Sequence, residues 1–427
     1  MWRSSIVDKQ VSINESRFSL IHLKELHNDL INNKIVNNIN ESIVIETLRE
    51  LAEMVVYGDN KSELLFDFFC EKNMLSLFLE IMWVEGCPNT VHIQILQTLS
   101  ILIKCVKNDT SLYYLLSNNY INEVIIYPYN IDNDESLRDQ FASFMKSLSL
   151  RLDNQIVQFF FIEDTGAFPI LSKAIDMLKI SEPMVRTASQ ATILNVYKVD
   201  DKKARPYALQ NHVMNSFFHQ IITLFEGHYM TLLTLCQDHL KYTNISYTCD
   251  IDDDIALKNF NNHISDLFNS IQDWFYYLAD VYELDIAKLQ IALTIHLMSQ
   301  FIIPILLSPL SKYASSSSSS TTLQSEVVVV EEEEAVNEEK SYTKTENLSS
   351  NIIVSLTFLN QLLRIIQDPL LHRVIMIVIF SKNPGNDITN STTTTTITTI
   401  TSNTTINTIN TTTNTNTTTT RSMEGFS

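Results

Sequence analysis

Apolar residues recur at intervals of three and four positions through most of residues 18–310, and strict alternation of apolar and polar residues is rare. This spacing puts the apolar side chains on one side of an α-helix. Only six glycines occur in the 427 residues, so few positions favour flexible turns. The pattern therefore predicts an all-α protein.

Two helix starts can be located from polar residues and proline. The segment Asp132–Asp134 precedes ESLRDQFASFMKSLSLRL, and Ser181-Glu182-Pro183 precedes MVRTASQATILNVYKV. Asp and Asn side chains accept hydrogen bonds from the free N–H groups of a first turn, and proline fits the first helical position. We predict a helix over each stretch.

Four stretches share the order of apolar helix, polar corner and apolar helix. They are LFDFFCEKNMLSLFL (65–79), LYYLLSNNYINEVII (112–126), FFFIEDTGAFPILSKAI (159–175) and YALQNHVMNSFFHQII (207–222). Their corner residues, Asn73, Asn119, Gly166 and Asn211, are 46, 47 and 45 residues apart. Asn and Gly enter the left-handed backbone region at least cost, so we predict structural corners at which the chain reverses.

A repeat of this length with two or three helices is typical of HEAT and armadillo proteins. We therefore predict a right-handed helical solenoid over residues 18–313. The stretch EPMVRTASQAT (182–192) supports this, because HEAT repeats favour an acidic residue and a Val-Arg pair where the second helix begins. Glu182 and Arg186 are accordingly predicted to be structural, with the arginine bonding across the repeat.

The composition changes outside the solenoid. Residues 314–347 are rich in serine and acidic residues, and residues 383–427 consist mainly of Thr and Asn, so we expect a disordered loop and a disordered tail. Between them, residues 348–382 have a helical pattern and are expected to return and pack on the solenoid. Residues 1–17 form a separate N-terminal segment.

Acidic residues outnumber basic ones by 49 to 30, which gives a formal charge of −19. This charge repels phosphate backbones, so we expect no nucleic-acid partner, and it weakens direct electrostatic binding to anionic membranes. The five cysteines are odd in number and have no C-x-x-C spacing, which favours reduced thiols in a cytosolic protein. No apolar run follows the N-terminus, so no signal peptide is expected.

One apolar segment leaves two interpretations open. Ile291–Leu310 carries no formal charge and just reaches the length that a membrane-spanning helix needs. Pro304 within it equally fits a buried, kinked helix.

Sequence motifs of catalysis are missing. The glycines are too sparse for a phosphate or dinucleotide loop, no H-E-x-x-H occurs, and no cysteine spacing fits a zinc ribbon or RING. Asp250–Asp254 lacks the glycine of a calcium loop, because Ile255 stands at that position. A looser group of possible ligands is interpreted as ordinary residues of packed helices: His212, His219, His228, His239 and Cys236. We expect no metal, no cofactor and no small-molecule substrate.

Clusters of aromatic residues are the remaining candidates for a partner site. Tyr113 and Tyr114 are adjacent, so one of them is expected in the core and the other in contact with a partner. Trp274 and Tyr277 belong to an aromatic run that fits a core first and a groove for a partner peptide second.

Several ordered stretches resemble the FPL-domain family. They are FSLIHLKELHNDL (18–30), ETLRELAEMVVYGDNKSELLFDFFCEKNM (46–74), SLYYLLSNNYIN (111–122), MVRTASQATILNVYKV (184–199) and IIVSLTFLNQLLRIIQDPLL (352–371). The family's domain would cover about residues 46–199. Its animal members are the endosomal maturation defective proteins, one of which carries a C-type-lectin name, and plants have relatives too.

The resemblance implies a non-enzymatic scaffold or adaptor in endosomal maturation, endosome-to-lysosome trafficking, autophagy and mitophagy. Its expected partners are class C Vps/HOPS-type tethering proteins and ubiquitin-ligase machinery. Its expected location is cytoplasmic, peripheral on endosomes, lysosomes or the Golgi. The alternative is a component of, or catalyst in, an E3 ubiquitin-ligase complex, for which Cys70 and Cys249 would be the candidate nucleophiles. The chain departs from the family at Tyr57, where a Trp is expected, and we expect it to lack the long C-terminal region of family members.

Overall fold

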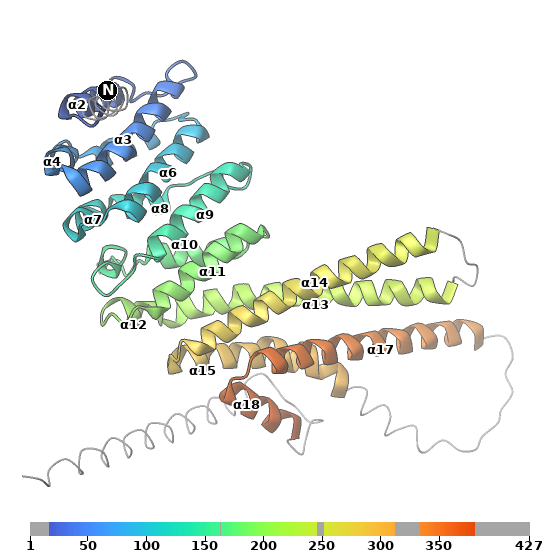
Figure 1. The fold of residues 1–427 in the computed structure, drawn as a ribbon. Helices are drawn as coiled ribbons and strands as arrows, with labels where there is room; N and C mark the ends of the chain where they lie inside the picture. Colours follow the sequence, from blue (N-terminus) through green and yellow to red (C-terminus); the bar gives the residue numbers. More distant parts are fainter. Residues whose placement is uncertain (1–16, 163, 246–251, 312–333, 381–427) are drawn as a thin grey trace, which may run out of the picture. The chain divides into compact units, whose positions relative to one another are not determined.

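The structure is a computed structural model that describes residues 17–162, 164–245, 252–311 and 334–380. It divides into two compact units, Met1–Val213 and Met214–Ser427, here called unit 1 and unit 2. Within the described ranges all regular secondary structure is helical, except for one isolated β-bridge between Ile162 and Ala167 (Figure 1). The predicted all-α class is confirmed.

Unit 1 is built on four long helices packed side by side. They are α3 (Glu41–Lys61), α6 (Asn89–Cys105), α9 (Glu135–Ser149) and α11 (Pro183–Lys198). Each packs on the next in the order of the sequence, from blue to green in Figure 1. We call this set the long-helix stack.

Shorter helices connect the members of the stack and form a second layer. They are α2 (Leu20–Asn32), α4 (Glu63–Glu71), α5 (Met74–Met82), α7 (Asp109–Leu116), α8 (Tyr120–Ile126), η1 (Val157–Phe159), α10 (Pro169–Met177) and α12 (Ala204–Ala208). In this layer α5 packs on α8, and α8 packs on α10. The two layers close around apolar faces, for example Val91, Ile95 and Leu102 of α6, which are almost completely buried.

Hydrogen bonds join residues that lie one repeat apart. Asn73 Nδ2 donates to Tyr120 Oη 47 residues away at 2.8 Å, and Thr98 Oγ1 donates to the Leu48 carbonyl 50 residues away at 3.1 Å. Asn195 Nδ2 donates to Ser149 Oγ across 46 residues. Neighbouring repeats thus satisfy each other's polar groups, as expected of a stacked array. The narrower assignment to the HEAT or armadillo type stays a prediction.

Both predicted helix starts are confirmed. The Asp134 side chain accepts a 3.0 Å hydrogen bond from Leu137 N at the start of α9, and Pro183 is the first residue of α11. Each residue supplies what a first turn needs, since an acceptor satisfies one free N–H and a proline has none to satisfy.

Unit 2 consists of longer helices. They are α13 (Asn211–Ile245, whose first residues belong to unit 1), α14 (Asp252–Glu283), α15 (Ala287–His296), η2 (Leu297–Leu307), α17 (Glu334–Ile365) and α18 (Pro369–Phe380). Their core is aromatic: the Phe225 ring lies 5.2 Å from that of Phe275 and 5.4 Å from that of Phe301, and Phe301 lies 5.9 Å from Phe358. Contacts of this kind add to the stability that burial provides. The single solenoid predicted over 18–313 is therefore divided between two units.

The predicted disorder of residues 314–347 is wrong for its second part. Helix α17 begins at Glu334, so the acidic segment from there onward is helical. Glu, Ala and Lys are strong helix formers, and here they outweigh the repulsion of the acidic run. Residues 314–333, the predicted tail 383–427 and nearly all of the predicted segment 1–17 lie outside the described residues.

The apolar segment around Pro304 is helical and partly buried in unit 2. In the described part of the chain, Ala287–Ser311 is the one helix long and apolar enough to cross a membrane, by length and composition. Its second half, η2, is a π-helix that contains Pro304. A wider helical turn is a common adjustment where a proline removes a backbone hydrogen bond. Leu293, Phe301 and Leu306 are buried inside unit 2.

Candidate partner-binding surface

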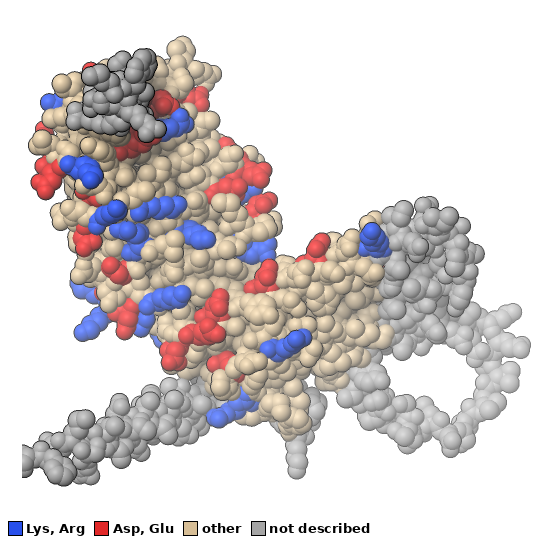
Figure 2. Space-filling model, in the orientation of Figure 1, with Lys and Arg blue, Asp and Glu red and all other residues tan. Residues whose placement is uncertain are grey.

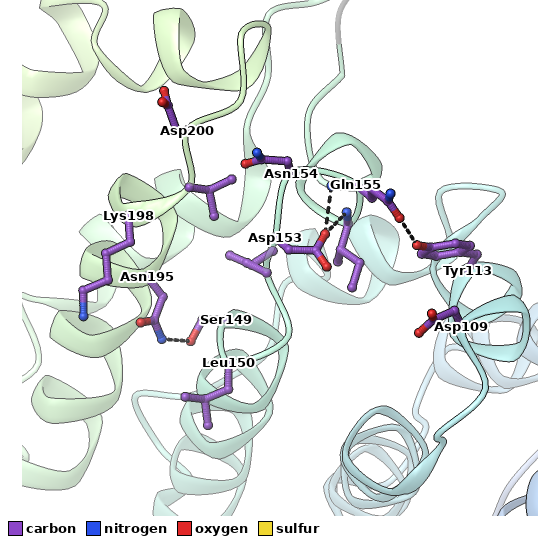
Figure 3. Close-up of a pocket in the computed structure, with 13 residues that line it drawn as sticks. Asp109, Tyr113, Ser149, Leu150, Asp153, Asn154, Gln155, Asn195, Lys198 and Asp200 are labelled. Atoms are coloured by element: carbon purple, nitrogen blue, oxygen red, sulfur yellow. Dashed lines mark hydrogen bonds between the residues drawn. The ribbon is translucent and has the colours of Figure 1, made fainter. Parts of the chain in front are cut away.

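A polar recess of about 740 Å³ opens in unit 1 where the stack meets the second layer. Figure 3 shows a loop that carries Asp153, Asn154 and Gln155. On one side of this loop lie Asp109 and Tyr113 of α7, and on the other side lie Asn195, Lys198 and Asp200. Leu150 adds an exposed apolar side chain to the lining. We call this hollow the α7–α11 recess.

The loop in the α7–α11 recess is held by its own hydrogen bonds. Asp153 Oδ1 accepts from the backbone N–H groups of Gln155 and Ile156, each at 2.8 Å. Tyr113 Oη donates to Gln155 Oε1, and Asn195 Nδ2 donates to Ser149 Oγ at 3.1 Å. These bonds fix the walls of the recess, and pre-formed walls reduce the entropy that binding costs.

The two adjacent tyrosines point in different directions. Tyr114 Oη donates to the Cys70 carbonyl at 2.8 Å, and its ring meets the edge of Phe66 at 6.2 Å. Burial raises the pKa of Tyr114 to about 12. Tyr113 lines the α7–α11 recess instead. Tyr114 thus packs between repeats, and Tyr113 is the one that a bound molecule could touch.

A second recess, of about 450 Å³, lies on the long-helix stack near α3 and α6. Its lining is mostly apolar and includes Phe18, Val56, Tyr57 and Ile101, with Lys61 at its border. Phe18 stacks on Tyr57 with ring centroids 4.3 Å apart. Tyr57 is therefore an aromatic wall of this α3–α6 recess.

Three of the four predicted corners have left-handed backbones. The φ angles are 46° at Asn73, 63° at Asn119 and 64° at Gly166, and Asn118 next to Asn119 has 58°. A side chain on Gly166 would also approach the Tyr207 ring, 3.1 Å from its Cε1 atom. Geometry and local packing account for these residues, and none of them lines either recess.

The left-handed assignment at Asn211 is wrong. Asn211 is the first residue of α13 and has no positive φ. Amide side chains are also favoured where a helix begins, because they accept hydrogen bonds from free N–H groups. Asn211 lies within the first turn of α13, whereas Asn73 and Asn119 directly precede α5 and α8.

The HEAT-like pair divides its contacts between the local turn and the neighbouring repeat. Arg186 Nη2 donates to the Ser181 carbonyl at 2.7 Å, five residues earlier. Glu182 reaches across the repeat, where its carboxylate lies 3.8 Å from Arg138 of α9. Glu182 and Arg138 thus form an ion pair across the repeat, and Arg186 bonds to the turn before α11. The cross-repeat bond of Arg186 stays a prediction.

Two predicted partner contacts are wrong. Trp274 and Tyr277 are 1% and 4% exposed, so no partner can reach them in this fold. Between them Tyr276 is 59% exposed. Successive residues of a helix are about 100° apart, and the aromatic run does not reveal which of its members faces outward.

The remaining candidates for chemistry find no support. Burial raises the pKa of the Cys70 thiol to about 12, with a further contribution from Asp67, and leaves almost no thiolate at neutral pH. Cys249 and Asp250 lie outside the described residues, and Asp252 is the first residue of α14. Among the residues that the structure describes, no group of three or more His, Cys, Asp and Glu side chains could hold a metal ion.

Sequence reasoning missed most of the residues that line the recesses. Asp153, Gln155 and Asn195 are ordinary polar residues at or near helix ends, where such residues are common for structural reasons. The one feature of the sequence that could have indicated these residues is their position, because they lie near the ends of successive long helices.

The fold and the two recesses define the chain as an all-α repeat protein whose surface suits the binding of other molecules. A family model described as "FPL: Uncharacterised conserved protein" matches residues 48–197, inside the predicted 46–199. The chain belongs to the FPL family, as the sequence predicted.

Named relatives share about a third of their aligned residues with the chain. "Protein CLEC16A homolog" of Drosophila melanogaster is 34% identical over 292 residues, which cover 68% of this chain and 26% of that protein. Human "Protein CLEC16A" is 34% identical over 288 residues, 67% of this chain and 26% of the relative. "Protein TRANSPARENT TESTA 9" of Arabidopsis thaliana is 32% identical over 301 residues, 70% and 34% respectively. The chain thus spans about a third or less of these proteins.

Proposed function

We propose that this chain is a non-enzymatic scaffold or adaptor that promotes endosomal maturation, endosome-to-lysosome trafficking, autophagy and mitophagy. Membership of the FPL family supports this role, because the resemblance to that family implies it. The observation that carries the scaffold part is the long-helix stack with the α3–α6 and α7–α11 recesses on unit 1. Extended surfaces of stacked repeats are commonly used to hold other proteins.

The proposed partners are tethering proteins of the class C Vps/HOPS type and ubiquitin-ligase machinery, at the cytoplasmic surface of endosomes, lysosomes or the Golgi. Binding at Tyr113 and in the α3–α6 recess would use aromatic side chains, which contribute large contact areas with few rotatable bonds. Catalysis by the chain itself is the less favoured alternative, since the raised pKa of Cys70 opposes nucleophilic attack by that residue.

A trafficking assay tests the proposal. Cells that lack the protein should degrade an endocytosed cargo more slowly and accumulate autophagosomes, and the full chain should restore both rates. The Trp274→Ala variant cannot serve as a probe of binding because it damages the core, so Tyr113→Ala is the suitable variant. Unchanged cargo degradation and autophagic flux after removal of the protein would contradict the proposal.

The ubiquitin alternative is tested separately with the purified full chain and a conjugating enzyme charged with ubiquitin. We expect no discharge of ubiquitin above the rate without the chain. Discharge that depends on Cys70 would instead establish catalysis.

A further inference from the structure

One lysine stands in the last turn of each member of the long-helix stack. These residues are Lys61 of α3, Lys104 of α6, Lys146 of α9 and Lys198 of α11, and we call them the lysine row. All four are exposed. In Figure 2, lysine and arginine groups are distributed over the face of unit 1 in view, with acidic groups among them.

The helix dipole alone does not account for the row. A lysine near a helix C-terminus is favoured by the dipole in every helix. Yet α2, α4, α5, α7, α8 and α10 of the same unit have no basic residue in their last turn, and the one in α12 is Arg205, which pairs with Asp200. A lysine in the last turn is thus a feature of the helices that stack side by side.

The lysine row also has no partner within the described part of the chain. None of its four ammonium groups forms an ion pair or hydrogen bond there, whereas Lys34, Lys72 and Lys179 each pair with a carboxylate. In a chain of formal charge −19, four exposed and unpaired cations in line are unexpected.

Carboxylates near the row are already engaged. Asp59 Oδ2 accepts from the backbone N–H of Lys107 at 2.8 Å, and Asp153 caps its own loop. Asp200 pairs with Arg205 at 2.6 Å. Asp109 also lines the α7–α11 recess, but Figure 3 shows it on the opposite side of the recess from Lys198.

The spacing of the row fits an extended chain. Packed helices lie about 8–10 Å apart, so successive lysines recur at about that interval. A polyproline-type peptide rises ~3.1 Å per residue with three residues per turn, which returns a side chain to the same side every ~9 Å. The long, flexible lysine side chain takes up the remaining mismatch.

From these observations we propose that the lysine row binds an acidic, extended peptide segment of a partner protein, with Asp or Glu at every third position. An apolar residue at one end of the segment enters the α3–α6 recess, which Lys61 borders, and the other end reaches the α7–α11 recess, which Lys198 lines. A narrow peptide meets the lysine row and, at its ends, recess carboxylates such as Glu53 and Asp153, which Arg17 and loop N–H groups already engage. An anionic bilayer would also face the acidic remainder of the protein. This inference deepens the proposed scaffold function by naming the chemistry of its partner.

The test uses the full chain and fluorescent ten-residue peptides in an anisotropy titration. The first peptide has Glu at positions 1, 4, 7 and 10 with Pro and Ala between them, and the second has the same residues with the four Glu adjacent. The row variant is K104Q/K146Q/K198Q, and its matched control is K34Q/K72Q/K179Q, which loses the same charge elsewhere. Circular dichroism checks that both stay folded.

We expect the spaced peptide to bind at least about fivefold more tightly than the clustered one. The row variant should weaken binding of the spaced peptide about tenfold, since several exposed charge pairs are lost together. The control variant should stay within about twofold of the parent, and K104R/K146R/K198R should retain binding, because arginine keeps the charge.

The same titration is repeated with phosphatidylserine vesicles in place of the peptides. Three results would overturn the inference: no binding of the spaced peptide, equal losses in the row and control variants, or lysine-dependent binding only to the vesicles. The titration needs no cellular activity, so its outcome is separate from that of the trafficking assay. A failed titration leaves the scaffold proposal standing, and a failed trafficking assay leaves the peptide site standing.

Discussion

Asn119 offers the sharpest test of the repeat geometry. Its φ of 63° and ψ of 3° place it in the left-handed region, at the corner between α7 and α8. The left-handed conformation costs an ordinary L-residue roughly 1–2 kcal/mol, and glycine avoids this cost. A β-branched residue at such a position is disfavoured further.

The side-chain contact of Asn119 is worth less than the backbone term. Asn119 Oδ1 accepts from Asn122 Nδ2 at 2.9 Å, but that amide also donates to the Phe159 carbonyl at 2.8 Å and keeps this partner when Asn119 is replaced. Asn119→Gly should therefore stay within about 0.5 kcal/mol of the parent. Asn119→Ala should lose about 1 kcal/mol relative to Asn119→Gly, and Asn119→Val should lose roughly 1–2 kcal/mol.

Thermal unfolding followed by circular dichroism measures these differences. For a unit of this size, 1 kcal/mol corresponds to a shift of about 2–4 °C in Tm. The control is the pair Asn211→Gly and Asn211→Ala. Because Asn211 is not left-handed, Asn211→Gly should be no more stable than Asn211→Ala. Equal Tm values for Asn119→Gly and Asn119→Val would refute the reasoning.

Three further outcomes follow from the burial of particular groups. In denaturant unfolding, Trp274→Ala should destabilise the protein by about 3–5 kcal/mol, and Tyr276→Ala by less than about 0.5 kcal/mol. Similar losses at both sites would contradict the burial of Trp274 and the exposure of Tyr276. Because the thiol of Cys70 keeps its proton up to a pKa of about 12, its thiolate fraction at pH 8 is about 1000-fold lower than for a pKa of 9.0. Mass spectrometry should accordingly find Cys70 unalkylated by iodoacetamide at pH 8 and readily alkylated in urea, and fast labelling of the native protein would contradict this pKa shift. Since Ala287–Ser311 is partly buried in unit 2, alkaline carbonate should release the protein from membranes; retention in the pellet would support a spanning helix instead.

The repeat was predictable because it depends on residues with strong backbone preferences. Asn73, Asn119 and Gly166 were found from their spacing, and each adopts the left-handed conformation. Asn211 shows where this inference stops, since an amide fits a helix start as well as a helix end. The acidic segment at the start of α17 shows a second limit, because composition typical of disorder also includes strong helix formers.

The surface was harder to predict than the fold. Adjacent aromatics such as Trp274 and Tyr276 differ in exposure by packing that a helical pattern alone does not specify. The lysine row depends on which helices stack side by side, and a last-turn lysine looks the same in sequence whether or not its helix belongs to the stack. These lysines become a candidate binding surface only once it is known which helices lie beside one another.

The central claim, that the chain acts by holding endolysosomal proteins, is tested most directly by proximity labelling in living cells. The full chain would be fused to a labelling enzyme and compared with the same enzyme free in the cytosol and with the K104Q/K146Q/K198Q variant. We predict enrichment of tethering, autophagy or ubiquitin-pathway proteins by the full chain, and a reduced set with the variant. Labelling by the full chain that matches the free enzyme would contradict the account.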